Sequence, residues 1–430
     1  MIRALLLVPA ALLLLGSSLD AAPAQRITLP NGLRVIVEPN SSTDIVAIEL
    51  LLDVSAADEP AEKSGLRYLV QRLLLRGTKE ESGQSMGRRL AAVGGVVDAT
   101  VGLDYVEIYA LVPAEGFEVA LELLAAAACD PAFAPEEVRR QKVDAQELAR
   151  AAREEPFQET YLAFREGLYG DHPYGRATLG MPSTLSSITR DDIVSFYREH
   201  YVARRAVLAI CGGVGKGRVL RAARDLFGEW RSGAAALDRA GAVSALQCSV
   251  LVARERPLRR THLILGFLAP AADESEYYAV HVLDSILGGG AGARLPRKLR
   301  EELGLVYHVS SFYPTLAADS HFGIYAATEA EHLETVKRAL LVLLTDLASD
   351  PVPEEELERA KHYLLGSYAL SHQRMKDQAY SLAWYETLGL GQDFEDRYKA
   401  SVGAVTPGQV QETAQSLLRR FVLAVTMPTV

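Results

Sequence analysis

The chain carries a long internal repeat, which limits its fold more than any other feature. The tetrapeptide AADE occurs at 56–59 and again at 271–274, and DPAFAPEE at 130–137 matches DPVPEE at 350–355. The matched segments lie 215 and 220 residues apart, close to half of the 430 residues, and they occur in the same order. Because two ordered matches at nearly one offset rarely arise by chance, the sequence predicts two halves built on one plan.

Each half shows strands, a helix, more strands and then two long helices. In the first half, runs rich in β-branched residues predict strands over 33–37, 45–54, 96–100 and 105–112. Apolar residues at helical spacing predict a helix over 62–75, and long stretches with few helix breakers predict helices over 115–128 and 135–153. Grouped strands and helices without strict alternation indicate an α+β fold, with two homologous α/β-sandwich halves that carry helices on one sheet face.

The segment 232–246 is rich in Gly, Ala and Ser and has no hydrophobic period, which is typical of a linker. It separates a predicted N-terminal domain over 26–231 from a C-terminal domain over 247–430. Residues 1–24 have the pattern of a signal peptide: Arg3, an apolar stretch, and a small-residue cleavage site that ends at Ala24. We therefore expect a periplasmic or secreted protein that does not span a membrane after cleavage, with an uncleaved anchor as the alternative.

Composition removes some function classes. The net charge of −10 argues against nucleic acid as a partner, because phosphate binding requires a basic surface. The three cysteines form no C-x-x-C pair, which argues against a cysteine-based zinc site.

The helix that starts near Gly65 has the sequence GLRYLVQRLLLRGT. It resembles the zinc helix of the pitrilysin, insulinase and mitochondrial processing peptidase family, which carries H-x-x-E-H between a Gly-Leu start and a Gly-Thr end. Tyr68, Gln71 and Arg72 stand where that motif has His, Glu and His. Arginine stays protonated and cannot bind zinc, and an amide cannot act as a general base. The resemblance implies that Glu147 matches the third ligand, so one ligand of three remains and we expect no metal in this chain.

Two opposite charges at ligand positions suggest that Arg72 and Glu147 form a salt bridge, in which the guanidinium replaces the missing cation. The alternative is that Glu147 faces solvent on a polar helix.

A glycine-rich turn in the second half, with Gly288, Gly289 and Gly290, precedes the sequence KLREELGLVYHV. This segment resembles the family signature in which an Arg and a Tyr, here Arg300 and Tyr307, hold the substrate and polarise the scissile carbonyl. A fixed cation and a hydroxyl donor suit a developing oxyanion. The alternative is that the glycines only allow the turn, that Arg300 is a solvated charge and that Tyr307 is a core aromatic residue.

Gly94, Gly95, Asp98 and Ala99 belong to GGVVDA, which resembles the Gly-Gly-x-x-Asn-Ala edge strand that binds substrate peptide in the family. Main-chain pairing with a peptide remains possible here, but Asp98 replaces the usual Asn and changes the local charge.

Taken together, the resemblance implies a clam-like half-chamber that lacks zinc and keeps the substrate-clamping pair. We expect a non-catalytic subunit of an exported heterodimeric zinc peptidase, inactive alone, that supplies Arg300 and Tyr307 to a zinc-bearing homologous partner. The zinc cofactor would then reside in the partner, and peptides or unfolded proteins would be the substrates. A structural scaffold subunit and a non-cleaving peptide-binding module are the alternatives.

Overall fold

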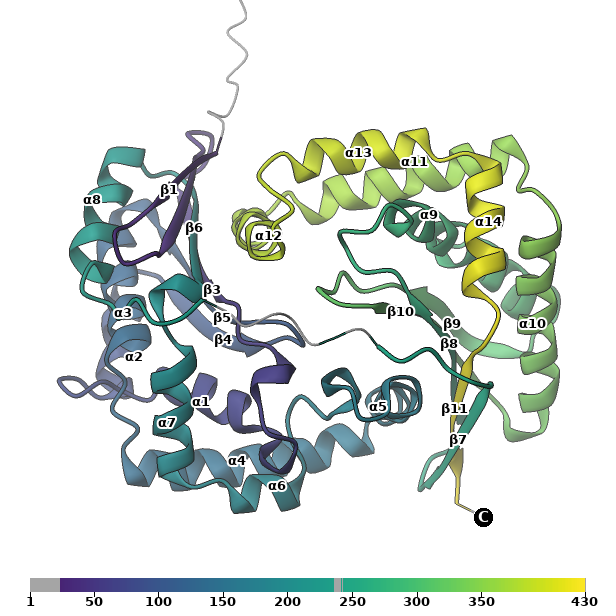
Figure 1. Ribbon diagram of the computed structural model, residues 1–430, viewed down its shortest axis with the longest axis horizontal. Coiled ribbons are helices and arrows are strands. Elements are labelled where there is room, and N and C mark those ends of the chain that lie inside the picture. Colours follow the sequence, from purple (N-terminus) through teal and green to yellow (C-terminus); the bar gives the residue numbers. More distant parts are fainter. Residues whose placement is uncertain (1–23, 236–240, 242, 430) are drawn as a thin grey trace, which may run out of the picture.

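The computed structural model describes residues 24–235, 241 and 243–429. The predicted signal peptide lies almost entirely outside this part of the chain, as does the middle of the predicted linker. The described strands form a six-stranded and a five-stranded sheet, one in each lobe (Figure 1). The strands are β1 (Gln25–Thr28), β2 (Arg34–Pro39), β3 (Ile45–Leu52), β4 (Val96–Val101), β5 (Val106–Pro113), β6 (Ala206–Gly212), β7 (Val250–Arg256), β8 (Thr261–Ala269), β9 (Val306–Phe312), β10 (Ser320–Thr328) and β11 (Val422–Pro428).

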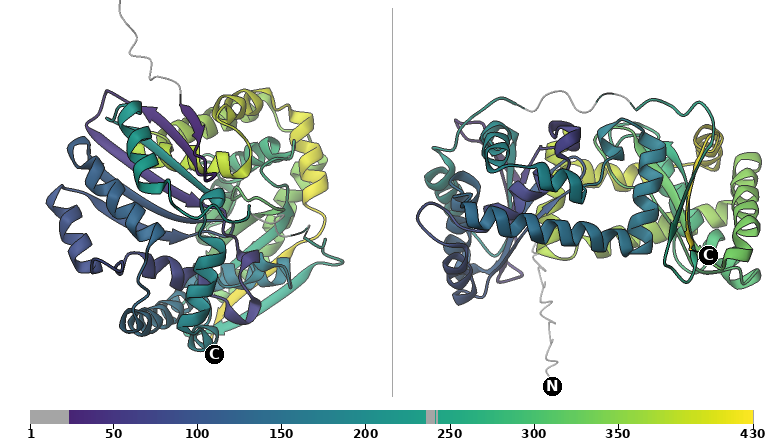
Figure 2. Two further views of the ribbon diagram at one scale, coloured as in Figure 1. Left: turned by 60° about the vertical axis from the view of Figure 1, so that its left-hand side comes forward. Right: turned by 90° about the horizontal axis from the view of Figure 1, so that it is seen from below.

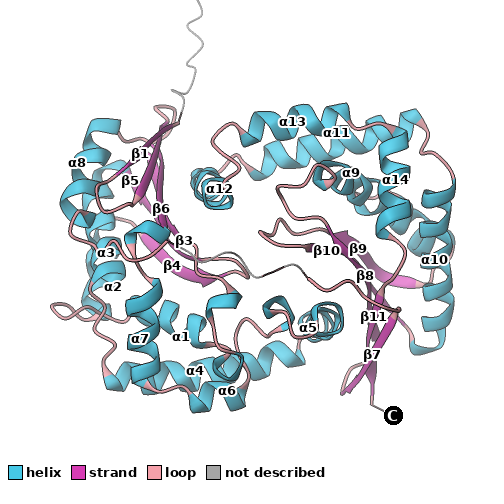
Figure 3. Ribbon diagram, viewed as in Figure 1, coloured by secondary structure: helices cyan, strands magenta, loops and turns pink. Residues whose placement is uncertain are grey.

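Helices surround both sheets (Figure 3). They are α1 (Leu66–Leu74), α2 (Gly83–Ala92), α3 (Phe117–Cys129), α4 (Pro135–Glu154), α5 (Pro156–Tyr169), α6 (Pro182–Ser187), α7 (Arg190–His200), α8 (Lys216–Phe227), α9 (Tyr277–Gly288), α10 (Leu333–Ser349), α11 (Glu354–Ser371), α12 (Met375–Leu388), α13 (Phe394–Ala404) and α14 (Pro407–Leu417). Short helical turns are η1 (Ala56–Asp58), η2 (Ala61–Lys63), η3 (Ala114–Gly116), η4 (Pro173–Gly175), η5 (Ala203–Arg205), η6 (Pro296–Glu302) and η7 (Ala330–His332), of which η6 is wound as a π-helix. Within this part of the chain, no helix combines the length and apolarity that crossing a bilayer requires.

The sheet topology confirms the fold class that the repeat predicted. The first sheet has the order β1-β2-β6-β3-β5-β4 and the second has β7-β11-β8-β10-β9. Without β1, the two orders correspond strand for strand, and the parallel pair β2 and β6 corresponds to the parallel pair β7 and β11. The other neighbouring strands are antiparallel in both sheets. The strands β4 and β9 therefore occupy equivalent edges.

The two lobes exchange helices, which the sequence did not indicate. Helix α5 of the first half packs on β8 and β11 of the second sheet, and α12 of the second half packs on β3 and β6 of the first. In Figure 1 both helices lie between the two sheets, and the view from below in Figure 2 shows the long helix α4 leading to α5. Glycines permit this approach, since a Cβ on Gly266 would lie 2.4 Å from the Phe164 ring and one on Gly167 would lie 2.8 Å from Val252.

The exchanged helices join the two hydrophobic cores. Ile36 and Leu51 of the first sheet belong to the same buried cluster as Ala383 and Trp384 of α12. Each sheet therefore has its own half's helices on one face and a helix of the other half on the opposite face. This arrangement buries apolar surface between the halves and holds them together as one molecule.

Candidate functional site

Helix α1 carries the residues at the zinc positions, and its start depends on a glycine. Gly65 precedes the helix with φ +96°, and a Cβ there would lie 2.7 Å from the Leu185 side chain. Because an L side chain rarely adopts that backbone conformation, glycine fits this position best. Leu66, Leu69 and Leu73 then anchor one face of α1 in the first core.

Gln71 is a buried structural amide. Its side chain is fully buried, its Nε2 donates to the backbone carbonyl of Glu107, and its Oε1 accepts from the Tyr201 hydroxyl at 3.0 Å. The amide thus uses both ends to satisfy buried polar groups of β5 and of the segment after α7. The sequence gave no sign of this structural role.

Arg72 pairs with Asp98, so the predicted salt bridge to Glu147 is wrong. The Arg72 Nη1 lies 3.0 Å from the Asp98 Oδ1 on β4 and 3.4 Å from the Ala99 carbonyl oxygen. Glu147 is exposed on α4 and forms no ion pair within the described residues. Each residue turns an α-helix by about 100°, so Glu147, two residues after the buried Ala145, lies roughly 160° away from it around the helix axis. Helical phase therefore directs Glu147 into solvent, as the alternative interpretation had it.

Tyr68 remains a neutral phenol. Burial raises its pKa, the Arg72 guanidinium opposes this, and the carboxylates of Asp144 and Asp98 add to the rise. Asp144 is thus the α4 acid with an electrostatic effect on this tyrosine. The helical phase of α4 was the signal that could have identified it, since Asp144 lies closer than Glu147 to the buried stripe that contains Ala145.

These residues do not fit a zinc ion. A neutral phenol, a hydrogen-bonded amide and a paired guanidinium offer none of the imidazole, thiolate or carboxylate ligands that zinc takes. Across the described ranges, no group of three or more His, Cys, Asp or Glu side chains could hold a metal. We therefore derive no metal-dependent step for this chain.

The predicted peptide-binding segment forms the turn into an edge strand. Gly94 has φ +70°, and a Cβ on Gly95 would lie 2.6 Å from Leu90, so both glycines suit the close turn from α2 into β4. Among the described strands, β4 pairs with β5 only, along Asp98 and Ala99, and has no strand at its other edge. The edge position is as the resemblance implied, while peptide binding there stays a prediction.

The glycine-rich turn positions β9. A Cβ on Gly288 would lie 2.2 Å from the Ser311 Oγ of β9, and one on Gly289 would lie 2.4 Å from the Ser285 carbonyl. Gly290 has φ +88° and faces the Tyr363 ring of α11. The glycines therefore let α9 end tightly against β9 and α11. This packing accounts for them, and a role in substrate binding stays a prediction.

Arg300 and Tyr307 are both on the surface. Tyr307 is 56% exposed, which excludes the interpretation of a core aromatic residue. Its hydroxyl donates to the Glu329 Oε1 at 2.8 Å, and the Arg260 guanidinium lies 3.6 Å from its ring centroid. Arg300 lies on η6, where its exposed guanidinium has Glu301 at 3.5 Å as a weak partner.

The described contacts do not join Arg300 to Tyr307 directly. Each of the two side chains has its own partners. Glu329 and Arg260 hold Tyr307 in place, and the sequence did not indicate either contact. The short segment between η6 and β9 keeps the pair in the same part of the lobe. Both side chains are thus available to a molecule outside this chain.

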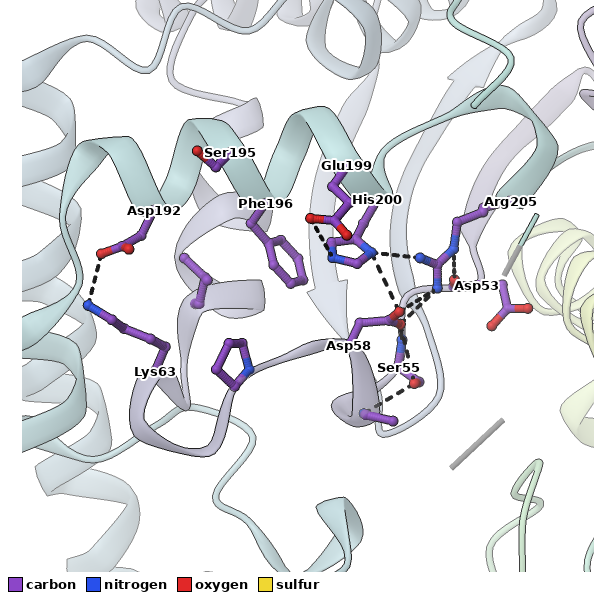
Figure 4. Close-up of a pocket in the computed structure, with 13 residues that line it drawn as sticks. Asp53, Ser55, Asp58, Lys63, Asp192, Ser195, Phe196, Glu199, His200 and Arg205 are labelled. Carbon is purple, nitrogen blue, oxygen red and sulfur yellow. Dashed lines mark hydrogen bonds and ion pairs between the residues drawn. The ribbon is translucent and has the colours of Figure 1, made fainter. Parts of the chain in front are cut away.

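A separate hollow of about 490 Å³ lies beside α7 (Figure 4). Arg205 donates two hydrogen bonds to Asp58 at 2.8 and 2.9 Å, and its Nη1 lies 2.7 Å from the His200 Nδ1. Burial lowers the pKa of His200, while Asp58 opposes the effect. Ser195 lies on the same helix, yet no hydrogen bond joins it to His200 in the described part of the chain. This group ties α7 to η1 and lacks the geometry of a nucleophile with its base.

Comparison with known proteins identifies the family of the chain. Residues 34–181 match the family described as insulinase (peptidase family M16), and residues 187–364 match the peptidase M16 inactive domain. An uncharacterized zinc protease of Rickettsia felis is 30% identical over 349 residues, which cover 81% of this chain and 83% of that protein. One of Mycobacterium leprae is 28% identical over 414 residues, covering 94% and 91% respectively.

Two solved structures share the fold. A peptidase M16 inactive domain from Pseudomonas fluorescens superposes with a TM-score of 0.88 at 22% identity, covering 95% of this chain and 98% of that one. A protease from Helicobacter pylori gives a TM-score of 0.89 at 19% identity, with 95% and 100% covered. The sequence matches extend over both halves, so the chain belongs to the insulinase family of peptidases, M16, and its second half is of the inactive-domain type.

Proposed function

We propose that this chain is the non-catalytic subunit of an exported heterodimeric zinc peptidase. In this assembly a zinc-bearing homologue cleaves peptides or unfolded proteins, and Arg300 and Tyr307 reach its site from this chain. The chain alone neither binds zinc at stoichiometry nor cleaves peptide.

One observation carries the proposal: the first lobe has no zinc ligands at the family's zinc positions on α1, whereas the second lobe exposes a cation and a hydroxyl donor. The α1 positions are filled by side chains with partners of their own, Gln71 in the core and Arg72 on Asp98. The second lobe keeps an exposed guanidinium and an exposed phenol on neighbouring elements. A cation and a hydroxyl donor stabilise a developing oxyanion, but without a nucleophile or a metal they need a partner to act on a peptide bond.

The test begins with the tagged full-length chain, purified from its native host together with its bound protein. The complex is assayed with a quenched fluorogenic peptide, with wild-type chain and with the double variant Arg300→Ala/Tyr307→Phe. We expect kcat to fall by roughly 100-fold or more, since removal of one oxyanion donor typically costs that much. Lys298→Ala is the matched control, because Lys298 is an exposed residue of the same η6 turn that pairs with Glu302.

Zinc content of the isolated chain is the second measurement. Stoichiometric zinc with chelator-sensitive hydrolysis by this chain alone would refute the proposal. An intact complex whose turnover is unchanged in the double variant would also refute it and would favour the structural scaffold.

A further inference from the structure

The open edge of β4 is a potential binding surface on general grounds. In the part of the chain that the structure describes, β4 is the outermost strand of its sheet and has β5 as its single strand partner. An outer strand exposes backbone N–H and C=O groups that can pair with another extended segment. Val96, near the start of the strand, is 58% exposed, so the edge is not covered there.

Two side chains occupy this edge at Ala99. The Ala99 N–H donates to the Asp98 Oδ1 at 2.8 Å, and the Ala99 carbonyl oxygen accepts from the Arg72 Nη1 at 3.4 Å. The same two atoms, Arg72 Nη1 and Asp98 Oδ1, lie 3.0 Å apart. One ion pair therefore satisfies both backbone groups that a new strand would need at this residue.

We propose that the Arg72–Asp98 pair closes the edge of β4, and that an extended peptide opens it by placing its own carboxylate on Arg72. This goes beyond the proposed function, because it concerns what the first lobe of the isolated chain binds. Strand addition at Ala99 requires Asp98 to leave the Ala99 N–H and the Arg72 Nη1 to leave the carbonyl.

The charge of the peptide matters once the pair has separated. The Arg72 side chain is 30% exposed, and a cation this far withdrawn from water is costly without an anion beside it. A neutral peptide would gain backbone hydrogen bonds and leave Arg72 unpaired. An acidic side chain or a terminal carboxylate opposite Ala99 would replace Asp98 and restore the pair. The ligand class is therefore an extended peptide with a carboxylate at that position.

The experiment measures binding of two labelled, unstructured peptides to the full chain by fluorescence anisotropy. The peptides differ only in a central Glu or Gln. The variants are Asp98→Ala, which leaves Arg72 without its partner, and Arg72→Met/Asp98→Ala, which removes both. The double variant leaves no unpaired charge at this edge, so it can be tested even if Asp98→Ala does not fold. Arg89→Ala is the control, since Arg89 forms exposed ion pairs with Glu81 and Glu122 on α2 and α3.

Wild-type chain and the Arg89→Ala control should bind both peptides weakly, the Glu peptide more tightly of the two. Asp98→Ala should bind the Glu peptide about tenfold more tightly than wild type does, the size of effect expected from one or two freed backbone hydrogen bonds. The double variant should bind the two peptides equally, and both more tightly than wild type. Folded variants that gain no affinity would overturn the inference, as would a double variant that still prefers Glu. Neither result depends on a partner protein, so failure here is separate from failure of the heterodimer proposal.

Discussion

Gln71→Glu, which restores the acidic residue of the family's zinc motif, should destabilise the fold and do so most at high pH. The Gln71 Nε2 is the donor to the Glu107 carbonyl, and the side chain is fully buried. An ionised glutamate has no donor, so that carbonyl would lose its partner at a cost of about 1–3 kcal/mol. Burial of the charged carboxylate adds a desolvation cost. This cost is limited, because the group can take up a proton and become neutral. We expect a loss of about 3 kcal/mol in the free energy of unfolding at pH 8.

The pH dependence follows from the direction of the shift. Burial beside a carbonyl raises the pKa of the introduced carboxyl above its unfolded value of about 4.3. The protonated acid can donate to the Glu107 carbonyl much as the amide does. The deficit is therefore smallest below pH 4.3 and grows by about 1.4 kcal/mol per pH unit until the folded pKa is passed.

The assay is urea unfolding followed by circular dichroism, with variant and wild type compared at pH 4.5 and pH 8. Gln84→Glu is the control, because Gln84 is exposed on α2. It should change stability by less than about 0.5 kcal/mol at both pH values. A deficit in Gln71→Glu that is equal at the two pH values, or no larger than that of the control, would refute the reasoning.

Two further predictions concern the second lobe. Gly290→Ala should lower the free energy of unfolding by about 2 kcal/mol, because φ is +88° and the new Cβ would lie 2.9 Å from the Tyr363 ring. Gly292→Ala, in the same turn with open space around its Cβ, is the control, and equal thermal stabilities would contradict this view. Acid should also destabilise the fold through His321, which is fully buried between the Tyr161 and Tyr169 hydroxyls and whose pKa burial lowers to about 3. Between pH 6 and 4 the unfolded imidazole binds a proton and the folded one does not, so stability falls by about 1.4 kcal/mol per pH unit. His321→Gln should show a shallower slope than wild type in denaturation at several pH values, and the half-buried His332→Gln should not. Identical slopes for all three proteins would contradict the assignment.

Local structure in the first half was largely readable from residue patterns. The strand predicted over 45–54 is β3 (Ile45–Leu52), and the helix predicted over 135–153 is α4 (Pro135–Glu154). The helix predicted over 62–75 is shorter, since η2 and the left-handed Gly65 precede α1 (Leu66–Leu74). Period and turn residues carry this information because they act between near neighbours in the chain.

Contacts between segments far apart in the chain were harder to predict from the sequence. The sequence gave no sign that α5 and α12 would cross to the opposite sheets, because their apolar faces look the same whichever sheet they cover. It indicated Tyr307 as a candidate for contact with other molecules; the structure shows that the side chain is exposed, and the contact itself stays a prediction. It did not indicate Glu329, which directly follows β10, or Arg260, which directly precedes β8.

The sequence by itself determined that the chain has a duplicated peptidase-family fold and that the residues at the zinc positions do not fit a zinc ion, because a guanidinium offers no lone pair and an amide no titratable carboxylate. Only the tertiary structure decided which partner Arg72 takes. An ion pair needs charges a few ångströms apart, and the packing of α1 beside β4 brings Asp98 within reach, while the helical phase of α4 turns Glu147 into solvent.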